Sequence, residues 1–237
     1  QLEENGANIV DIGGMSTAPY LKTIVSEKVE SERVSKTIRI IQNSSNLPIS
    51  VDTCRASVAK IALELGVDVI NDISGLKYDD EMPNIIEKYG PSVILCAYGK
   101  NSVTGNHISM TKKLLNESVK IAQKCNISTD KIVLDPAIGF FRRSSDVKNK
   151  LPYTKINSDW AQRDIEIIKN LKSLKTNYPL LISISNKSFL GKFLDKDDPS
   201  DRNIGTALAE MTSILNGVSI IRTHNPKITS DVIKMTK

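Results

Sequence analysis

The sequence has 237 residues, of which 40% are hydrophobic and 25% are charged, a composition typical of a soluble folded domain with a substantial core. Its 32 basic and 27 acidic residues give a formal charge of +5, and the lysines are dispersed rather than clustered, which argues against nucleic acid as a partner. No apolar run approaches the roughly 20 residues needed to span a bilayer, so we expect no membrane partner.

The beginning of the chain and its cysteines indicate its context. Residues 1–6 have the pattern of the middle of a helix, and the sequence has no initiating Met. We therefore expect that residues before Gln1, and any targeting peptide among them, are lacking from the sequence. The three cysteines, Cys54, Cys96 and Cys125, form neither a close pair nor a zinc-ligand spacing. Such a dispersed, odd set of thiols is typical of a reducing compartment, which predicts a cytoplasmic location.

Seven short segments rich in Ile, Val and Leu have the length and composition of buried strands. They are Asn8–Ile12, Pro48–Val51, Val67–Ile70, Ser92–Leu95, Lys131–Leu134, Leu180–Ile184 and Val218–Ile221. Amphipathic segments between them have apolar residues three and four positions apart, which indicates helices. These are Ser26–Gln42, Arg55–Leu65, Met82–Tyr89, Thr111–Lys124, Trp160–Leu174 and Thr206–Leu215. The alternation predicts a parallel sheet covered by helices.

The strand count favours a closed barrel over an open sheet. Seven strands that follow a helix fit an α/β fold of the (β/α)₈ TIM barrel type whose first strand is missing from the sequence. An open sheet would carry a glycine-rich phosphate loop, and Gly13-Gly14 is too short to be one. With no linker visible, we expect one barrel domain over residues 1–237, open between its first and last visible strands. The long connections Ala97–Met110 and Phe140–Asp159 are expected to serve function.

Polar residues stand at the carboxyl ends of the predicted strands, which meet on one face of a barrel, where barrel enzymes keep their active sites. They are Asp11, Asp52, Asn71-Asp72, Cys96, Asp135, Ser185 to Lys187, Arg222 and His224. Any one of them could be an ordinary helix cap or turn residue, but the whole set predicts a site. The carboxylates and the amide suit a flat heterocycle with several N–H donors. The cationic residues suit a phosphate or diphosphate.

Seven segments in chain order resemble the signature motifs of dihydropteroate synthases, from the first visible strand to the last. They read DIGGMSTAPY (11–20), ISVDT (49–53), VINDISG (69–75), LDPAIGF (134–140), SISNKSFLG (183–191), DRNIGTALA (201–209) and IIRTHNP (220–226). The resemblance implies a TIM barrel and a transferase of folate biosynthesis. That transferase condenses a 6-hydroxymethyl-dihydropterin diphosphate with 4-aminobenzoate or a related arylamine and releases diphosphate.

The resemblance also implies roles for individual residues. The implied substrate-binding residues are Asp11, Ser16, Thr17, Asp52, Asn71, Asp135, Phe140, Ser185, Lys187, Arg222 and His224. Asp52, Asn71, Asp135 and Lys187 would line the pterin pocket, and the catalytic residues would be Lys187, Arg222 and His224, the last two holding the diphosphate. Ser16, Thr17, Phe140 and Ser185 would lie near the arylamine. A Mg²⁺ ion bound with the diphosphate and a homodimer packed through barrel helices are implied as well.

The sequence departs from the family pattern mainly around the second substrate. Ala18 and Asn186 stand where the family usually has arginines, Cys96-Ala97-Tyr98 replaces Met-His-Met, and Phe141-Arg142-Arg143 stands where Gly-Lys is common. Since the carboxylate of 4-aminobenzoate then lacks an obvious cation, we expect it to be recognised weakly. A phosphorylated arylamine that reaches Arg142 or Arg143 is expected to be used at least as well.

Two other functions stay open. A pterin-dependent methyltransferase acting with a corrinoid protein resembles the chain in its Asp, Asn, Asp pocket and in Ser185-Asn186. Lys187 and the Arg222/His224 pair argue against it, because a methyl donor carries no diphosphate. A non-catalytic pterin-binding homologue is supported by the loss of the two arginines.

Five residues outside the motifs also allow interpretation. His107 lies in a polar segment, so we expect a solvated side chain, and Trp160 is expected to pack against the protein. Cys96 is expected to line the pocket with no base to activate it as a nucleophile. The pair Arg142-Arg143 is equally compatible with solvation and with a phosphate contact.

Overall fold

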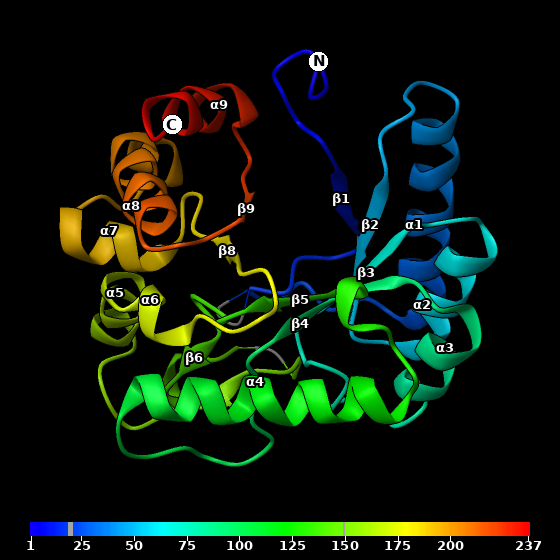
Figure 1. The fold of residues 1–237 in the computed structure, drawn as a ribbon, viewed down its shortest axis with the longest axis horizontal. Coiled ribbons are helices and arrows are strands. Elements are labelled where there is room, and N and C mark those ends of the chain that lie inside the picture. Colours follow the sequence, from blue (N-terminus) through cyan, green and yellow to red (C-terminus); the bar gives the residue numbers. More distant parts are fainter. Residues whose placement is uncertain (19–20, 149) are drawn as a thin grey trace.

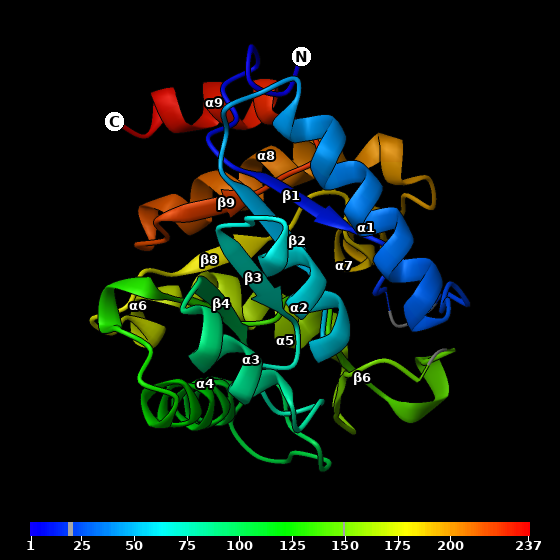
Figure 2. The ribbon, with the colours of Figure 1, turned by 90° about the vertical axis from the view of Figure 1, so that its right-hand side faces the viewer.

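The computed structural model describes residues 1–18, 21–148 and 150–237 (Figure 1). One sheet contains five parallel strands in chain order: β1 (Val10–Gly13), β2 (Ile49–Asp52), β3 (Val69–Asp72), β4 (Ser92–Cys96) and β5 (Ile132–Asp135). β8 (Leu181–Ser183) pairs in parallel with β9 (Ile220–Arg222), and a parallel bridge between Leu134 and Leu180 joins this pair to β5. The strands therefore follow one another in barrel order (Figure 2).

The helices lie around the outside of these strands. They are α1 (Glu27–Gln42), α2 (Ala56–Glu64), α3 (Met82–Tyr89), α4 (His107–Lys124), α5 (Trp160–Lys169), α6 (Leu171–Leu174), α7 (Ser188–Leu194), α8 (Asn203–Leu215) and α9 (Pro226–Met235). Short 3₁₀ helices span Thr129–Lys131, Ser144–Asp146 and Pro199–Arg202. No helix in the described ranges is long and apolar enough to cross a membrane.

The strands are short because each ends where its apolar residues give way to the polar residues of the site. Val51, Ile70 and Leu134 are completely buried between the barrel and its helices, and all four residues of β2 are buried. Side-chain caps fix where helices begin: Ser26 accepts from the Val29 amide, and Asp159 accepts from the Ala161 amide. The hydrophobic pattern and the caps together place the carboxyl ends of the strands on one face.

The predicted fold class is confirmed, with differences in detail. As expected, no ladder in the described residues joins β9 to β1, so the barrel is open there. Residues 1–6 form a turn in which the Asn5 amide binds the Gln1 carbonyl, so the predicted helix is wrong at this position. The predicted helix Trp160–Leu174 is divided at Asn170 into α5 and α6.

Two helices and two short strands had not been predicted, and one predicted helix begins earlier than expected. The helices α7 and α9 follow the last two strands, and α4 begins at His107, four residues before its predicted start at Thr111. The long connection after β5 contains two short parallel strands, β6 (Phe141–Arg142) and β7 (Thr154–Lys155). Backbone hydrogen bonds thus join the two described ends of this connection, and a bridge between Ile156 and Val103 joins it to the connection after β4.

Candidate active site

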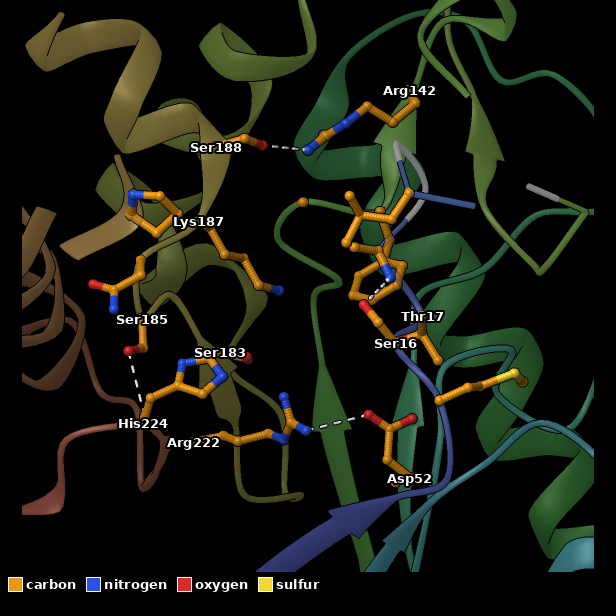
Figure 3. A pocket seen from close by; sticks show the side chains of 18 residues that line it. Ser16, Thr17, Asp52, Arg142, Ser183, Ser185, Lys187, Ser188, Arg222 and His224 are labelled. Atoms are coloured by element: carbon orange, nitrogen blue, oxygen red, sulfur yellow. Dashed lines mark hydrogen bonds and ion pairs between the residues drawn. The ribbon is translucent and has the colours of Figure 1, made fainter. Parts of the chain in front are cut away.

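A cavity of about 520 Å³ opens at the carboxyl ends of the strands. Figure 3 shows its walls: the segment after β1 lies on one side, and the segments after β8 and β9 lie opposite. The sequence-predicted residues that line it are Ser16, Thr17, Asp52, Phe140, Ser185, Lys187, Arg222 and His224. The other three, Asp11, Asn71 and Asp135, are not among the lining residues and lie in the neighbouring strands β1, β3 and β5. The predicted residues are thus gathered on one face.

Arg222 is held between two carboxylates at the inner end of the cavity. Its Nε lies 2.6 Å from an oxygen of Asp11, and its Nη2 lies 3.2 Å from an oxygen of Asp52. Asp11 also accepts from the Ser50 hydroxyl at 2.5 Å, and the Asn71 amide nitrogen is 3.5 Å from both of its oxygens. Burial lowers the pKa of Arg222, but the two carboxylates outweigh it and raise this pKa above its usual value.

Two buried acceptors at this inner end have no hydrogen-bond partner among the described residues: Asp52 Oδ1 and Asn71 Oδ1. Burial raises the pKa of Asp52 to about 7, against the opposing effect of Arg222 and with a further increase from Asp11. A buried acceptor without a donor costs about 1 to 3 kcal/mol of stability. A ligand with N–H donors would remove this cost, so the inner end is built to accept hydrogen bonds.

Lys187 and Asp135 lie on either side of the loop that follows β5. The Lys187 ammonium donates to the Ile138 carbonyl and lies 4.9 Å from the centre of the Phe140 ring. Burial lowers the pKa of Lys187 to about 8, although Asp135 opposes this shift. Burial also raises the pKa of Asp135, whose Oδ1 accepts from the Ala137 amide at 2.7 Å. Lys187 is therefore mainly protonated at neutral pH, and its charge faces the cavity.

The loop after β5 is fixed by two buried residues of α5. Arg163 donates to the Pro136 carbonyl at 2.7 Å and to the Ala137 carbonyl at 3.2 Å, while Asp164 accepts from the Gly139 amide at 3.0 Å. Gly139 has a φ of +86°, and a Cβ there would lie 3.0 Å from Lys187 Cδ. Glycine at this position thus permits both the loop conformation and the close approach of the lysine.

His224 follows β9 and lies next to Ser185. Its backbone amide donates to the Ser185 hydroxyl at 3.3 Å, as Figure 3 shows. Burial, together with the charges of Arg222 and Lys187, lowers the pKa of His224 below its usual 6.5. This shift favours the neutral imidazole, which can still donate one N–H to a ligand.

Arg142 lies at the outer end of the cavity, as Figure 3 shows. Its side chain is 2% exposed, its guanidinium lies 3.8 Å from the centre of the Trp160 ring, and its Nη2 donates to the Ser188 hydroxyl at 2.9 Å. The structure therefore places the guanidinium of Arg142 in the lining of the cavity. Arg143 is exposed and donates to the Ser158 carbonyl at 3.4 Å, outside the residues that line the cavity.

The structure also settles three expectations from residues outside the motifs. Trp160 packs against the core as expected. The expectation of a solvated His107 is wrong: its side chain is 19% exposed and binds Glu166 at 2.7 Å and Ser158 at 2.9 Å. Cys96 does not line the cavity, because its thiol is buried beneath the strand ends, and burial raises its pKa.

Asn186, which stands where a cation was expected, has another role. Its backbone has a φ of +56°, its amide nitrogen on the main chain binds the Thr206 hydroxyl at 3.1 Å, and its carbonyl accepts from Arg202 at 2.9 Å. These contacts anchor the segment after β8 to α8 and to the turn before it. In the described ranges, no group of three or more His, Cys, Asp or Glu side chains is arranged to hold a metal ion.

A parallel α/β barrel with charged strand ends around a cavity defines a barrel enzyme that binds a small polar ligand. Residues 1–224 match the family of pterin binding enzymes, and the chain belongs to this family. Its curated relatives include dihydropteroate synthases. The protein from Synechocystis is 33% identical over 98% of this chain and 77% of its own length, and that from Bacillus subtilis is 35% identical over 99% and 76%.

Solved structures agree with this assignment. The dihydropteroate synthase of Clostridium difficile, crystallised in the presence of pteroic acid, superimposes with a TM-score of 0.87 at 32% identity, covering 99% of this chain and 83% of that one. The enzyme of Coxiella burnetii in complex with pteroic acid gives a TM-score of 0.84 at 29% identity, covering 99% of this chain and 81% of that one.

Proposed function

We propose that this chain is a transferase that condenses a 6-hydroxymethyl-dihydropterin diphosphate with 4-aminobenzoate or a related arylamine. Membership of the pterin binding family and the dihydropteroate synthases among its relatives support this function. One observation carries it to this chain: the buried Asp52 Oδ1, which has no hydrogen-bond partner among the described residues, lines the same cavity as the cations Lys187 and Arg222. A pterin offers N–H donors to the former, and its diphosphate offers negative charge to the latter.

In this proposal the pterin ring occupies the inner end of the cavity. Asp52 and Asn71 accept its N–H groups through the oxygens that lack partners, and Asp135 and Lys187 bind its opposite edge. Pterin N–H groups compete with Arg222 for Asp52, so the Nη2 of Arg222 becomes available to the diphosphate. The ion pair of the protein without ligand would thus be exchanged for ligand contacts.

The reaction is a displacement at the methylene carbon of the pterin. The arylamine nitrogen forms the new C–N bond, the C–O bond to the diphosphate breaks, and the diphosphate leaves with the electron pair while the amine loses one proton to solvent. Arg222 and His224 stabilise the negative charge that builds on the leaving group, and such fixed contacts typically contribute a few kcal/mol to the barrier. A covalent intermediate is not required.

A Mg²⁺ ion also belongs to this proposal. The described residues offer no cage of ligands for it, and the acids nearest the cavity, Asp11 and Asp52, already bind Arg222. Magnesium commonly binds through substrate phosphates with few protein ligands, so we propose that it arrives with the diphosphate. No step above depends on it.

The two alternative functions are less well supported. A methyltransferase acting with a corrinoid protein would not need the cationic wall, and the relatives named dihydropteroate synthase favour the transferase. A non-catalytic homologue was suggested by the two missing arginines, and Arg142 at the outer end weakens that argument. Pyrophosphate release from the dihydropterin diphosphate plus 4-aminobenzoate tests the proposal. Pterin binding without turnover would favour the non-catalytic homologue.

We further propose one cytoplasmic domain over residues 1–237 that forms a homodimer. The free thiols of all three cysteines are buried, which supports a reducing compartment. On α8, the apolar residues Ile204, Leu208 and Leu215 are 73%, 61% and 57% exposed, and a second copy of the chain would cover them. Leu208→Glu is expected to convert dimer to monomer in sedimentation experiments. A monomeric unmodified protein would contradict this.

A further inference from the structure

We propose that Arg142, together with Ser188, binds the carboxylate of the arylamine and so determines the specificity for the second substrate. This inference rests on the function proposed above, which requires an arylamine in the outer part of the cavity. It assigns the carboxylate to Arg142, whereas the sequence had suggested Arg142 or Arg143 only for a phosphorylated arylamine.

The first support is the position of Arg142. Both Arg142 and Ser188 line the cavity, and Figure 3 shows them at one end of it, with Arg222 and Asp52 at the other. Phe140 also lines the cavity. A flat aromatic amine with its nitrogen toward the pterin end would therefore direct a group on the far side of its ring toward Arg142.

The second support is the way in which the guanidinium is fixed. One face of it stacks on Trp160 at 3.8 Å, Nη1 donates to the Phe141 carbonyl at 2.9 Å, and Nη2 donates to the Ser188 hydroxyl at 2.9 Å. A guanidinium that is already oriented loses little conformational entropy when it binds a carboxylate, and its planar shape matches that anion. The contacts therefore prepare the side chain for an anion.

The third support comes from burial and from the neighbouring charges. The side chain of Arg142 is 2% exposed, so water screens its charge poorly. Asp164 lies 3.9 Å from Arg142 Nη1, but it is closer to Arg163, at 3.0 Å, and it also accepts from the Gly139 amide. Asp164 is thus engaged mainly in fixing the loop after β5.

The neighbouring positions provide the contrast. Ala18 lines the cavity without a polar side chain, and the Asn186 side-chain oxygen accepts from Thr206 at 3.3 Å. Arg143 is exposed and lies outside the lining of the cavity. The sequence did not distinguish which of these two adjacent arginines would bind a ligand. In the structure, Arg142 lines the cavity and Arg143 does not.

The test compares 4-aminobenzoate with the neutral 4-aminobenzamide in pyrophosphate release. In the unmodified protein, we expect kcat/KM for the carboxylate to be at least tenfold higher. Arg142→Met should lower this ratio roughly 10- to 100-fold, the factor that corresponds to a hydrogen bond with a charged group. Arg142→Lys, which keeps the charge but loses the planar fork, should give an intermediate ratio. The matched control Arg143→Met should leave the ratio within about twofold of the original.

Several results would overturn the inference. One is a ratio in Arg142→Met within threefold of that of the unmodified protein, and another is an unmodified protein that prefers the amide. A larger loss for 4-aminophenyl phosphate than for 4-aminobenzoate would overturn the assignment to the carboxylate. If Arg142→Met does not fold, two other measurements test the inference. They are the kcat/KM ratio of Arg142→Lys and the competition between benzoate and benzamide as inhibitors of the unmodified protein. Absence of pyrophosphate release with every amine would instead overturn the proposed function, and this inference with it.

Discussion

The two ends of the cavity hold their arginines by different physical means. At the inner end, Arg222 extends from a strand and forms ion pairs with Asp11 and Asp52. At the outer end, Arg142 comes from the connection after β5, stacks on Trp160 and binds a serine hydroxyl. Ion pairs can be exchanged for ligand contacts, whereas stacking fixes a guanidinium without competing for its charge. We therefore expect the inner arginine to change its contacts when a ligand binds and the outer arginine to keep them.

The largest effect is expected from Arg222→Met. Loss of the cation that stabilises the departing diphosphate should lower kcat/KM about a thousandfold, or roughly 4 kcal/mol of transition-state stabilisation. The loss should be equal for acidic and neutral arylamines, because Arg222 does not face the arylamine substituent. Steady-state pyrophosphate release measures it, and Arg222→Lys should recover part of the activity. A loss of activity confined to 4-aminobenzoate would instead assign the arylamine carboxylate to Arg222, and would contradict the separate roles of the two arginines.

A smaller effect is expected from Asp135→Asn at the inner end. This change keeps the shape of the side chain but replaces a buried charged acceptor, so pterin affinity should fall roughly 10- to 100-fold while the fold persists. Calorimetric titration with the pterin substrate measures it, and circular dichroism verifies the fold. Asp130→Asn is the matched control, because Asp130 lies just before the same strand and is exposed. Unchanged affinity would remove Asp135 from the pterin site.

The pH dependence tests the inner end through Asp52. Burial raises the pKa of Asp52 to about 7, so at pH 6 it is mainly protonated and cannot accept at both oxygens. Pterin affinity should therefore rise by up to tenfold per pH unit toward pH 7 and level off above it. The free energy of unfolding of the unliganded protein should depend on pH in the opposite direction. The folded state binds the Asp52 proton more tightly than the unfolded chain does, so the stability that this proton contributes is lost as the pH rises through 7. Affinity that is constant between pH 5.5 and 8 would contradict this prediction.

The smallest effect is expected from Gly139→Ala, between the two ends. The added Cβ would lie 3.0 Å from Lys187 Cδ on a backbone with φ of +86°, so it should both strain the loop and displace the lysine. We expect KM for the pterin substrate to rise about three- to tenfold, with about 1 kcal/mol lost from the free energy of unfolding.

Gly217→Ala provides the matched control for this change. Its φ is +93°, but nothing lies within 4 Å of the added Cβ. It should therefore cost similar stability in thermal unfolding and leave KM unchanged. If both variants changed KM equally, the effect at Gly139 would be one of general strain rather than of contact with Lys187.

The same two ends show how far sequence reasoning reached. The inner end was predictable because Asp52, Asn71, Asp135 and Arg222 occupy strand ends, and parallel strands bring their carboxyl ends to one face. The family match and the solved structures confirm the predicted family and the barrel. What could not be predicted was that Arg222 would be paired with Asp11 and Asp52, since side-chain pairing depends on rotamers that no pattern encodes.

The outer end was harder to predict because loops form it. Arg142 and Arg143 are adjacent and chemically identical, and only the pairing of β6 with β7 decides which one is buried. His107 was misjudged for a similar reason: its two partners lie 51 and 59 residues away in the sequence. The short helix α7 was missed because seven residues give too little periodicity to identify a helix.

The opening between β9 and β1 gives the ion pairs of Arg222 a mechanical consequence. These contacts cross the opening, because Arg222 belongs to β9, Asp11 to β1 and Asp52 to β2. Elsewhere β8 and β9 connect to the larger sheet through the bridge between Leu134 and Leu180. A ligand that binds Asp52 and Lys187 together would therefore fasten the two parts of the barrel. Amide hydrogens of β9 should then exchange with solvent more slowly when the cavity is filled, while those at the centre of the larger sheet should exchange at unchanged rates.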